Sequence, residues 1–220
     1  MRKYNMRAVI PYKNENAKSR LSPILSKKDR EEFVELMLKD VIKALDDAEV
    51  VNIDILTTSA EGIPNDFNGN VTITEPGLND SINEYLQNAN EPILIIMADL
   101  PLVTGDHIRK IISFSEDVVI VPGKGGGTNI LFIRHPNEFT VKYHDCSFIS
   151  HCEITDELDK SMHIFDSFLA STDIDEPHDI VELMLHGKGQ AKEYAEKRFG
   201  SETGKGRVKI SHLSKLSGFV

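Results

Sequence analysis

The sequence predicts an α/β domain in three layers, with a mostly parallel sheet between helices. Short apolar runs alternate along the 220 residues with longer amphipathic stretches, which is typical of strands connected by helices. One run, residues 92–97, is continuously apolar, as expected of a central strand buried on both faces. A hydrophobic content of 40% and a charged content of 27% are ordinary for one large globular domain.

The individual elements can be placed in order along the chain. Apolar runs predict strands at residues 8–10, 50–56, 71–73, 92–97, 118–121 and 129–133. Residues 26–29 have the form of a capping box and precede a helix whose apolar positions are Phe33, Met37, Val41 and Ala44. Further helices are predicted at residues 81–89 and 106–114, and a last one from Pro177 to near Gly187.

The last 34 residues, 187–220, differ in charge from the rest. They hold eight Lys or Arg against three Glu, which leaves a net charge of −15 on the other residues of a chain whose total is −10. We predict that residues 1–186 form the catalytic domain and that residues 187–220 are a basic extension, not an independent domain. This extension is either a solvated tail or an arm that docks on the acidic body or on a second subunit of a homodimer.

Composition excludes several classes of protein. A net charge of −10 argues against a general nucleic-acid binder, which needs a basic face. No apolar run approaches the roughly 20 residues of a membrane helix, and the N-terminus lacks the apolar stretch of a signal peptide. Two cysteines, Cys146 and Cys152, give no disulfide framework. We therefore expect a cytoplasmic protein that binds neither nucleic acid nor membrane.

Three cations, Lys13, Lys18 and Arg20, lie within eight residues just after the first predicted strand. A nucleoside triphosphate needs cations at its phosphate oxygens, and arginine offers a fork that grips phosphate with two hydrogen bonds. No glycine occurs before Gly62, so the loop is not a glycine-rich phosphate cradle and any contact must come from side chains. The alternative is a solvated basic loop.

Three aspartates are candidate metal ligands. Asp99 follows the most apolar strand, and ligands of parallel α/β folds bind beyond the carboxyl ends of the strands. Mg²⁺ takes one or two carboxylates there together with substrate phosphates. Asp173 and Asp175 lie two apart on an extended segment, so they point to the same side. Alternatively, Asp99 caps the turn before Pro101, and Asp175 is the N-cap of the last predicted helix.

Two further segments offer hydroxyl and backbone N–H groups. Residues 125–127 are glycines that allow a ligand close to the backbone, with the Thr128 hydroxyl beside them, although a plain hairpin turn explains them equally. Residues 143–152 contain two His and two Cys, but their spacing matches no standard zinc site, and a Cys–His nucleophile lacks a third orienting partner. A helix that begins at Ser147 would bind an anion instead.

In order and spacing these motifs resemble those of the 2-phospho-L-lactate guanylyltransferases of deazaflavin coenzyme F420 biosynthesis. The resemblance runs from about residue 6 to residue 183. It rests on Pro11-x-Lys13 with residues 17–23, Gly77-Leu78-Asn79, Ala98-Asp99-Leu100-Pro101, Gly126-Gly127-Thr128-Asn129, Ser147-Phe148-x-x-His151 and Asp173-x-Asp175-x-Pro177. Residues 144–146 depart from the pattern, because relatives often have a glycine-rich turn there. The basic tail after His186 lies outside the resemblance.

The resemblance implies a fold of the nucleotide-diphospho-sugar transferase-like (GT-A) type. It implies a reaction that joins GTP and 2-phospho-L-lactate into lactyl-diphospho-guanosine, with Mg²⁺ as cofactor and release of pyrophosphate. The implied roles are triphosphate contacts for Lys13, Lys18 and Arg20; metal contacts for Asp99, Asp173 and Asp175; nucleotide contacts for Pro11, Thr58, Gly77 and Asn79; and acceptor contacts for Thr128, Asn129 and Ser147.

Two other functions remain open on the sequence. The first is nucleotidyl transfer to another acceptor, such as phosphoenolpyruvate, a sugar phosphate or a molybdopterin. The second is a catalytically silent nucleotide-binding regulator. Three candidate carboxylates face three loop cations, and removing this many charged groups from water costs free energy. A protein that only binds a nucleotide has less need of such a cluster, so the cluster favours an active site. Magnesium-dependent release of pyrophosphate would discriminate between an enzyme and a regulator.

Overall fold

The computed structural model describes residues 5–75, 77–202 and 208–212. Seven strands form one sheet in the order β3-β2-β1-β4-β6-β5-β7, so β4 lies at its centre. Neighbouring strands are parallel, except that β6 runs antiparallel to both β4 and β5. The strands are β1 (Arg7–Tyr12), β2 (Ile53–Thr57), β3 (Asn70–Ile73), β4 (Ile93–Ile96), β5 (Val118–Pro122), β6 (Thr128–Ile133) and β7 (Met162–Ile164).

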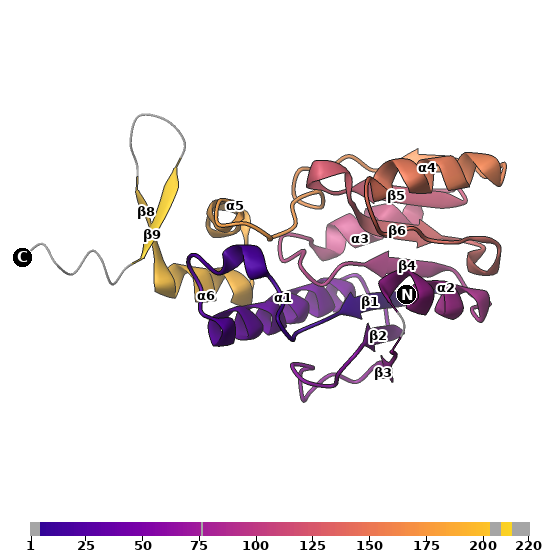
Figure 1. Cartoon of the computed structure of the whole chain (residues 1–220). Helices are drawn as coiled ribbons and strands as arrows, with labels where there is room; N and C mark the ends of the chain where they lie inside the picture. Colours follow the sequence, from indigo (N-terminus) through magenta and orange to yellow (C-terminus); the bar gives the residue numbers. More distant parts are fainter. Residues whose placement is uncertain (1–4, 76, 203–207, 213–220) are drawn as a thin grey trace, which may run out of the picture.

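Helices lie on both faces of this sheet (Figure 1). One face is covered by α1 (Lys27–Asp47), α3 (Gly105–Ser113), α5 (Asp179–His186) and α6 (Gln190–Arg198). The other face is covered by α2 (Leu78–Gln87) and α4 (Ser147–Glu157). A separate hairpin of β8 (Phe199–Glu202) and β9 (Lys209–His212) extends beyond α6, at the left of Figure 1. Short 3₁₀ turns occupy Ser19–Leu21, Lys124–Gly126 and Pro136–Glu138.

Strand β4 joins the two layers of the core. Leu94 and Ile96 belong to the apolar cluster beneath α1 and α3, whereas Ile93 and Ile95 belong to the cluster beneath α2 and α4. All four side chains are fully buried. Burying an aliphatic side chain of this size contributes about 1.5–3 kcal/mol. The predicted central strand, buried on both faces, is thus confirmed.

The predicted helix starts are partly right. Ser26 is the N-cap of α1, and its hydroxyl oxygen accepts a hydrogen bond from the Asp29 N–H at 3.2 Å. At the other end of the chain, α5 begins at Asp179, two residues after Pro177, with His178 as its N-cap residue. The alternative in which Asp175 is the N-cap is therefore wrong. Asp175 lies before the helix instead, where its N–H and that of Glu176 donate to the Asp179 carboxylate.

The basic extension begins with a helix that packs on the body. Tyr194 of α6 stacks on Phe33 of α1, with ring centroids 5.5 Å apart. Arg198 pairs with Asp29 at 3.2 Å and Glu32 at 3.4 Å. Of the two alternatives for the basic extension, a solvated tail or a docked arm, the position of α6 agrees with an arm that docks on the acidic body. The sequence did not predict α6, β7 or the β8–β9 hairpin, and residues 203–207 and 213–220 lie outside the described residues.

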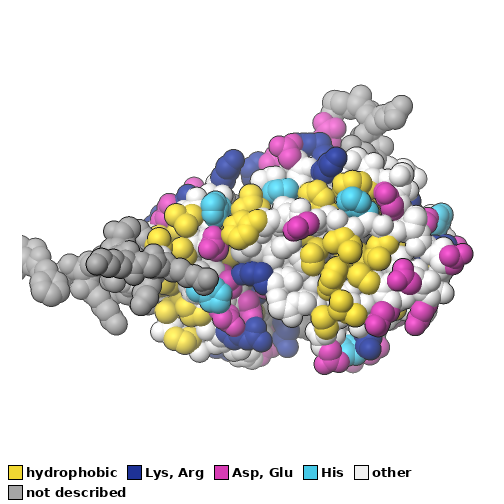
Figure 2. All heavy atoms as spheres, turned by 90° about the horizontal axis from the view of Figure 1, so that it is seen from above, with side chains coloured by type: hydrophobic (Ala, Val, Ile, Leu, Met, Phe, Trp, Pro, Cys, Tyr) yellow, Lys and Arg dark blue, Asp and Glu magenta, His cyan; other side chains and the backbone are white. Residues whose placement is uncertain are grey.

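In the described part of the chain, no helix is both long and apolar enough to cross a membrane. On the face seen in Figure 2, acidic side chains lie beside basic ones at the top and in the lower centre, whereas uncharged atoms fill much of the middle. The excess of acidic residues that the composition predicts is therefore interspersed with cations on this face rather than separated from them.

Candidate functional site

The predicted site residues meet at one edge of the sheet. Strands β1, β2 and β4 are parallel, so the residues that follow them, Lys13, Thr58 and Asp99, lie at the same edge. Strand β6 runs in the opposite direction and brings its first residues, Thr128 and Asn129, to that edge. A hydrogen bond of 3.1 Å from the Met97 N–H to the Asn129 carbonyl fixes this position.

Lys18 is the centre of an ionic cluster at this edge. Its ammonium lies 2.5 Å from Asp99 and 3.2 Å from Asp175, and the Arg20 guanidinium also pairs with Asp175. Burial opposes the charge on Lys18, but Asp99 and Asp175 outweigh it and raise its pKa above the ordinary value. Two of the three predicted loop cations are thus bound to two of the three predicted carboxylates, and the loop is not merely solvated.

Lys18 itself adopts a left-handed backbone conformation, with φ 52° and ψ 46°. A residue with a side chain adopts this region at a cost of about 1–3 kcal/mol, and such residues cluster at functional sites. The ion pairs to Asp99 and Asp175 hold the side chain, and hydrogen bonds from Leu21 and Ala17 hold the surrounding turn. The loop therefore presents Lys18 toward the carboxylates before any ligand binds.

Asp173 carries an unsatisfied carboxylate oxygen. Its Oδ1 is buried and has no hydrogen-bond partner among the described residues. Burial first, and the negative charge of Asp99 second, raise the pKa of Asp173. The Ile174 N–H, in the same segment, donates to the Asp99 carbonyl at 3.0 Å, which holds this segment against the end of β4. Two repelling carboxylates with an unsatisfied oxygen fit a divalent cation.

The structure places Asp175 differently from the other two aspartates. Its carboxylate oxygens are both paired, one with Lys18 and one with Arg20. Within the described ranges, no group of three His, Cys, Asp or Glu side chains is arranged to hold a metal ion. Asp173 is thus the one of the three predicted metal ligands with a buried oxygen that has no partner among the described residues, and the role of Asp175 as a metal ligand stays a prediction.

The predicted nucleotide residues line a cleft beside the ionic cluster. Pro11, Thr58 and Gly77 all border one cavity of about 550 Å³, and Lys13, which was predicted to contact the triphosphate, borders it as well. Asn79, the fourth residue predicted for the nucleotide, is not in that lining. Its side chain joins α2 to the loop before α4 instead, through hydrogen bonds with the Tyr143 N–H at 2.5 Å and His144 Nδ1 at 2.9 Å.

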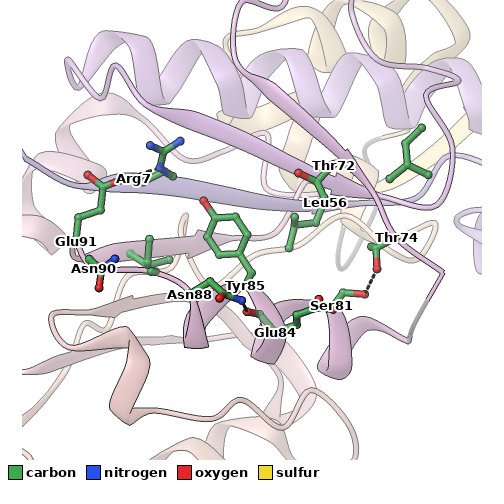
Figure 3. A pocket seen from close by; sticks show the side chains of 13 residues that line it. Arg7, Leu56, Thr72, Thr74, Ser81, Glu84, Tyr85, Asn88, Asn90 and Glu91 are labelled. Carbon is green, nitrogen blue, oxygen red and sulfur yellow. Dashed lines mark hydrogen bonds and ion pairs between the residues drawn. The ribbon is translucent and has the colours of Figure 1, made fainter.

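A second cavity, of about 650 Å³, continues this cleft between α2 and the strands β2 and β3 (Figure 3). Leu56, Thr74 and Ser81 border both cavities. At the far end of the second cavity, Arg7 pairs with Glu91 at 2.8 Å. Arg7 begins β1, and Glu91 precedes β4, so this end lies at the opposite edge of the sheet from Asp99. The end of the second cavity that Arg7 and Glu91 border is thus remote from the ionic cluster.

The predicted acceptor residues form a buried pair of hydroxyl groups. Ser147, the first residue of α4, donates from its Oγ to Thr128 Oγ1 at 3.3 Å, and both side chains are buried. Thr128 Oγ1 also lies 2.9 Å from Nδ1 of His151. Asn129 is buried as well, but its side-chain amide donates to the Ala170 carbonyl at 3.0 Å. The predicted helix start at Ser147 is confirmed.

The turn beside Thr128 requires glycine at one position. Residues 123–127 form a hairpin between β5 and β6, as the alternative interpretation had it, and Gly126 has φ 91°. A Cβ atom at Gly126 would lie 2.7 Å from the Cys146 sulfur. In the loop before α4, Asp145 has φ 52°, a conformation that glycine adopts without strain. This is the segment where the sequence departs from a glycine-rich pattern.

A buried carboxylate that the sequence analysis missed connects the two halves of the site. Asp179 accepts the N–H groups of Asp175 at 2.9 Å and Glu176 at 2.8 Å, and it pairs with Lys124 from the hairpin. Burial opposes its ionisation, but the hydrogen bonds from Lys124, Asp175 and Glu176 outweigh burial and lower its pKa. Asp175 and Glu176 lie close to Asp179 in the chain, but Lys124 lies 55 residues away, and no local pattern indicates that contact.

Comparisons with known proteins show the family to which this chain is similar. The family model described as "Guanylyl transferase CofC like" matches residues 6–211, so the similarity extends past His186, where we expected it to end. The 2-phospho-L-lactate guanylyltransferase of Methanosarcina barkeri is 52% identical over 208 residues, which cover 94% of this chain and all of that protein. The enzyme of the same name from Methanosarcina mazei is 54% identical, with the same coverage of both chains.

Solved structures support the fold alone. The putative nucleotide-diphospho-sugar transferase from Desulfovibrio desulfuricans superposes with a TM-score of 0.73 at 12% identity, over 88% of this chain and 95% of that chain. The 4-diphosphocytidyl-2C-methyl-D-erythritol synthase from Anaerococcus prevotii gives a TM-score of 0.55 at 14% identity, over 88% and 97%. The predicted fold class is confirmed.

Proposed function

This chain belongs to the family of CofC-like guanylyl transferases, and from that premise we propose that it joins GTP and 2-phospho-L-lactate into lactyl-diphospho-guanosine. It is a nucleotidyltransferase, and the reaction is the guanylyl-transfer step of coenzyme F420 biosynthesis. The strongest structural support for this proposal is the position of Lys18. Lys18 lies between Asp99 and Asp175 at the sheet edge, beside the cavity that Pro11, Lys13 and Thr58 border.

The reaction is one in-line displacement. An oxygen of the acceptor phosphate attacks the α-phosphorus of GTP, the bond to the bridging oxygen breaks, and pyrophosphate leaves with the bonding electron pair. The acceptor phosphate is largely a dianion near neutral pH, so the step needs no general base. Catalysis then consists of positioning and charge neutralisation. Lys13, Lys18 and Arg20 supply the protein's positive charge for the triphosphate.

Mg²⁺ is the proposed cofactor, and its role is to neutralise phosphate charge. Asp99 and Asp173 would hold it, because Asp173 has a buried oxygen without a partner. Asp175 keeps Lys18 and Arg20 in place on the other side of the cluster. When the triphosphate binds, its oxygens compete with Asp175 for these two cations, and the ion pairs support a phosphate site beside Lys18 and Arg20.

The acceptor acid presents two anionic groups and almost no apolar body. Its proposed site is the hydroxyl pair of Thr128 and Ser147 together with the free N–H groups at the start of α4. We propose further that the protein works in the cytoplasm as a homodimer and without nucleic acid, in keeping with its net charge of −10.

The test is a screen for pyrophosphate release. Four nucleoside triphosphates are combined with 2-phospho-L-lactate, phosphoenolpyruvate, a sugar phosphate and no acceptor, each with and without Mg²⁺. We expect release to be fastest with GTP and 2-phospho-L-lactate, and to require both the acid and Mg²⁺. Faster release with another acceptor would replace the proposed substrate. GTP binding without release under any condition would make the chain a silent regulator.

A further inference from the structure

His151 has both of its ring nitrogens engaged inside the protein. It lies in α4 one turn after Ser147 and is fully buried. The Lys142 backbone N–H donates to His151 Nε2 at 3.0 Å, so Nε2 carries no hydrogen. Burial lowers the pKa of His151 to about 4, and the ring is neutral near neutral pH. A neutral imidazole with a bare Nε2 has its hydrogen on Nδ1.

This tautomer decides the direction of the next hydrogen bond. His151 Nδ1 lies 2.9 Å from Thr128 Oγ1, and with its hydrogen it must be the donor. Thr128 Oγ1 accepts a second hydrogen bond from Ser147 Oγ at 3.3 Å. A hydroxyl oxygen has two acceptor lone pairs, and both are then occupied. The hydrogen of the Thr128 hydroxyl must therefore point away from His151 and Ser147.

We propose that His151 is a positioning residue that fixes the Thr128 hydroxyl as a hydrogen-bond donor toward the anionic acceptor. The proposal rests on the function proposed above, in which the acceptor acid binds at Thr128. Hydrogen bonds in a chain polarise one another, so donation from His151 also strengthens donation by Thr128. A carboxylate or phosphate oxygen, which can only accept, satisfies this hydroxyl, whereas a ligand that offers only donors does not.

The ring environment supports a positioning role. The Tyr143 ring meets the His151 ring edge to face, with centroids 4.9 Å apart, and Phe139 lies 6.4 Å away. Thr155, one turn further along α4, donates to the His151 carbonyl at 2.6 Å. The imidazole is thus held by aromatic packing and by its helix. Its Nδ1–H can act on the substrate only through Thr128.

A matched pair of variants separates the hydrogen-bond donor from the structural role. His151→Leu and His151→Asn both lose the acceptor for the Lys142 N–H, but the Asn side-chain amide can still donate to Thr128. We expect His151→Leu to raise the KM for the acid about ten- to a hundred-fold, and His151→Asn to recover most of that loss. The GTP dissociation constant, measured by calorimetry without acid, should stay unchanged in both.

Two controls complete this comparison. Thr155→Val removes a buried hydroxyl from the same helix and should leave the KM for the acid near that of the parent. In a Thr128→Val background, His151→Leu should have no further effect on the KM, because the histidine acts through the threonine. Equal KM values for the Leu and Asn variants, or additive effects in the double variant, would overturn the proposal.

A measurement on the unaltered protein keeps the proposal testable even when a variant does not fold. In protein labelled with ¹⁵N-histidine, two-bond ¹H–¹⁵N spectra distinguish the two imidazole tautomers. The His151 resonance is identified as the one that is absent in His151→Asn, or by the chemical shift of a buried imidazole. We expect this resonance to show hydrogen on Nδ1. Hydrogen on Nε2 would overturn the proposal. A parent that uses no phosphorylated acid would contradict the proposed function instead, so the two failures are distinct.

Discussion

Replacing Lys18 with methionine tests whether its ion pairs hold the site together. Lys18→Met keeps the length of the side chain and removes its charge at a position where that side chain is 11% exposed. Asp99 and Asp175 lose their shared cation, which lies 2.5 and 3.2 Å from them. Breaking a buried ion pair costs about 3–5 kcal/mol. Both carboxylates keep 27% exposure, so we expect a loss of about 2–3 kcal/mol.

The measurement is urea unfolding in the presence of a chelator. Lys43→Met is the matched control, because Lys43 pairs with Asp47 at 2.9 Å but is 71% exposed. Its free energy of unfolding should stay within about 0.5 kcal/mol of that of the parent. The dependence on urea concentration should be the same for all three proteins, since each exposes the same surface on unfolding.

Added Mg²⁺ should return part of the stability lost in Lys18→Met, since a bound cation replaces the ammonium beside Asp99 and ligand binding stabilises the folded state. A Lys18→Met protein as stable as Lys43→Met would refute the reasoning about the ion pairs. A destabilised variant that gains nothing from Mg²⁺ would show instead that these carboxylates are not a cation site.

Four further predictions concern individual roles in the reaction. Asp99→Asn should fold normally but lose at least about 10²-fold in turnover, and near-normal activity would reject Asp99 as a metal contact. Arg20→Lys should raise the KM for GTP although the charge is kept, because the fork is lost; unchanged constants would exclude a two-point phosphate contact. Thr128→Val and Ser147→Ala should each weaken use of the acid about ten- to a hundred-fold, with calorimetric GTP binding unchanged; loss of GTP binding instead would move them to the nucleotide half. Asp173→Asn should stabilise the metal-free protein near neutral pH, because burial and Asp99 raise the pKa of Asp173 and disfavour its charge. This gain in stability should disappear as the pH falls through that pKa to below the ordinary value of an aspartate. Urea unfolding at two pH values tests it.

The sequence alone predicts those parts of the fold and of the candidate site that produce a strong local pattern of residues. Residues 92–97 could be recognised as the central strand because a run buried on both faces is apolar throughout. Placing Asp99 at its end then located the ligand edge. Lys18 and Arg20 were found because three cations after a strand are conspicuous, and the structure pairs two of them with the carboxylates.

The features that could not be predicted from the sequence are those decided by contacts between distant segments of the chain. The tautomer of His151 is decided by the Lys142 N–H, and it acts on Thr128, which lies 23 residues away on another element. Helix α5 begins at Asp179 rather than at Pro177, and the Asp179 side chain bonds to Lys124 of the hairpin, a contact that the local sequence does not indicate. Helix α6 has few apolar side chains and gives little periodic signal, although Tyr194 packs on α1.

Because β6 runs antiparallel to its neighbours, the loops of the two halves of the site differ in how far they can be substituted without disturbing the fold. The nucleotide half follows parallel strands, and the connections from β1 to β2 and from β3 to β4 contain α1 and α2, so altering either connection displaces a helix. Residues 123–127 only join two adjacent antiparallel strands, and such hairpins accept exchanged or lengthened loops without loss of the sheet. Exchanging this hairpin while keeping Gly126 and Lys124, which pairs with Asp179, would therefore alter the proposed acceptor half without displacing a helix, which makes it the natural segment to exchange when engineering enzymes for other phosphorylated acids.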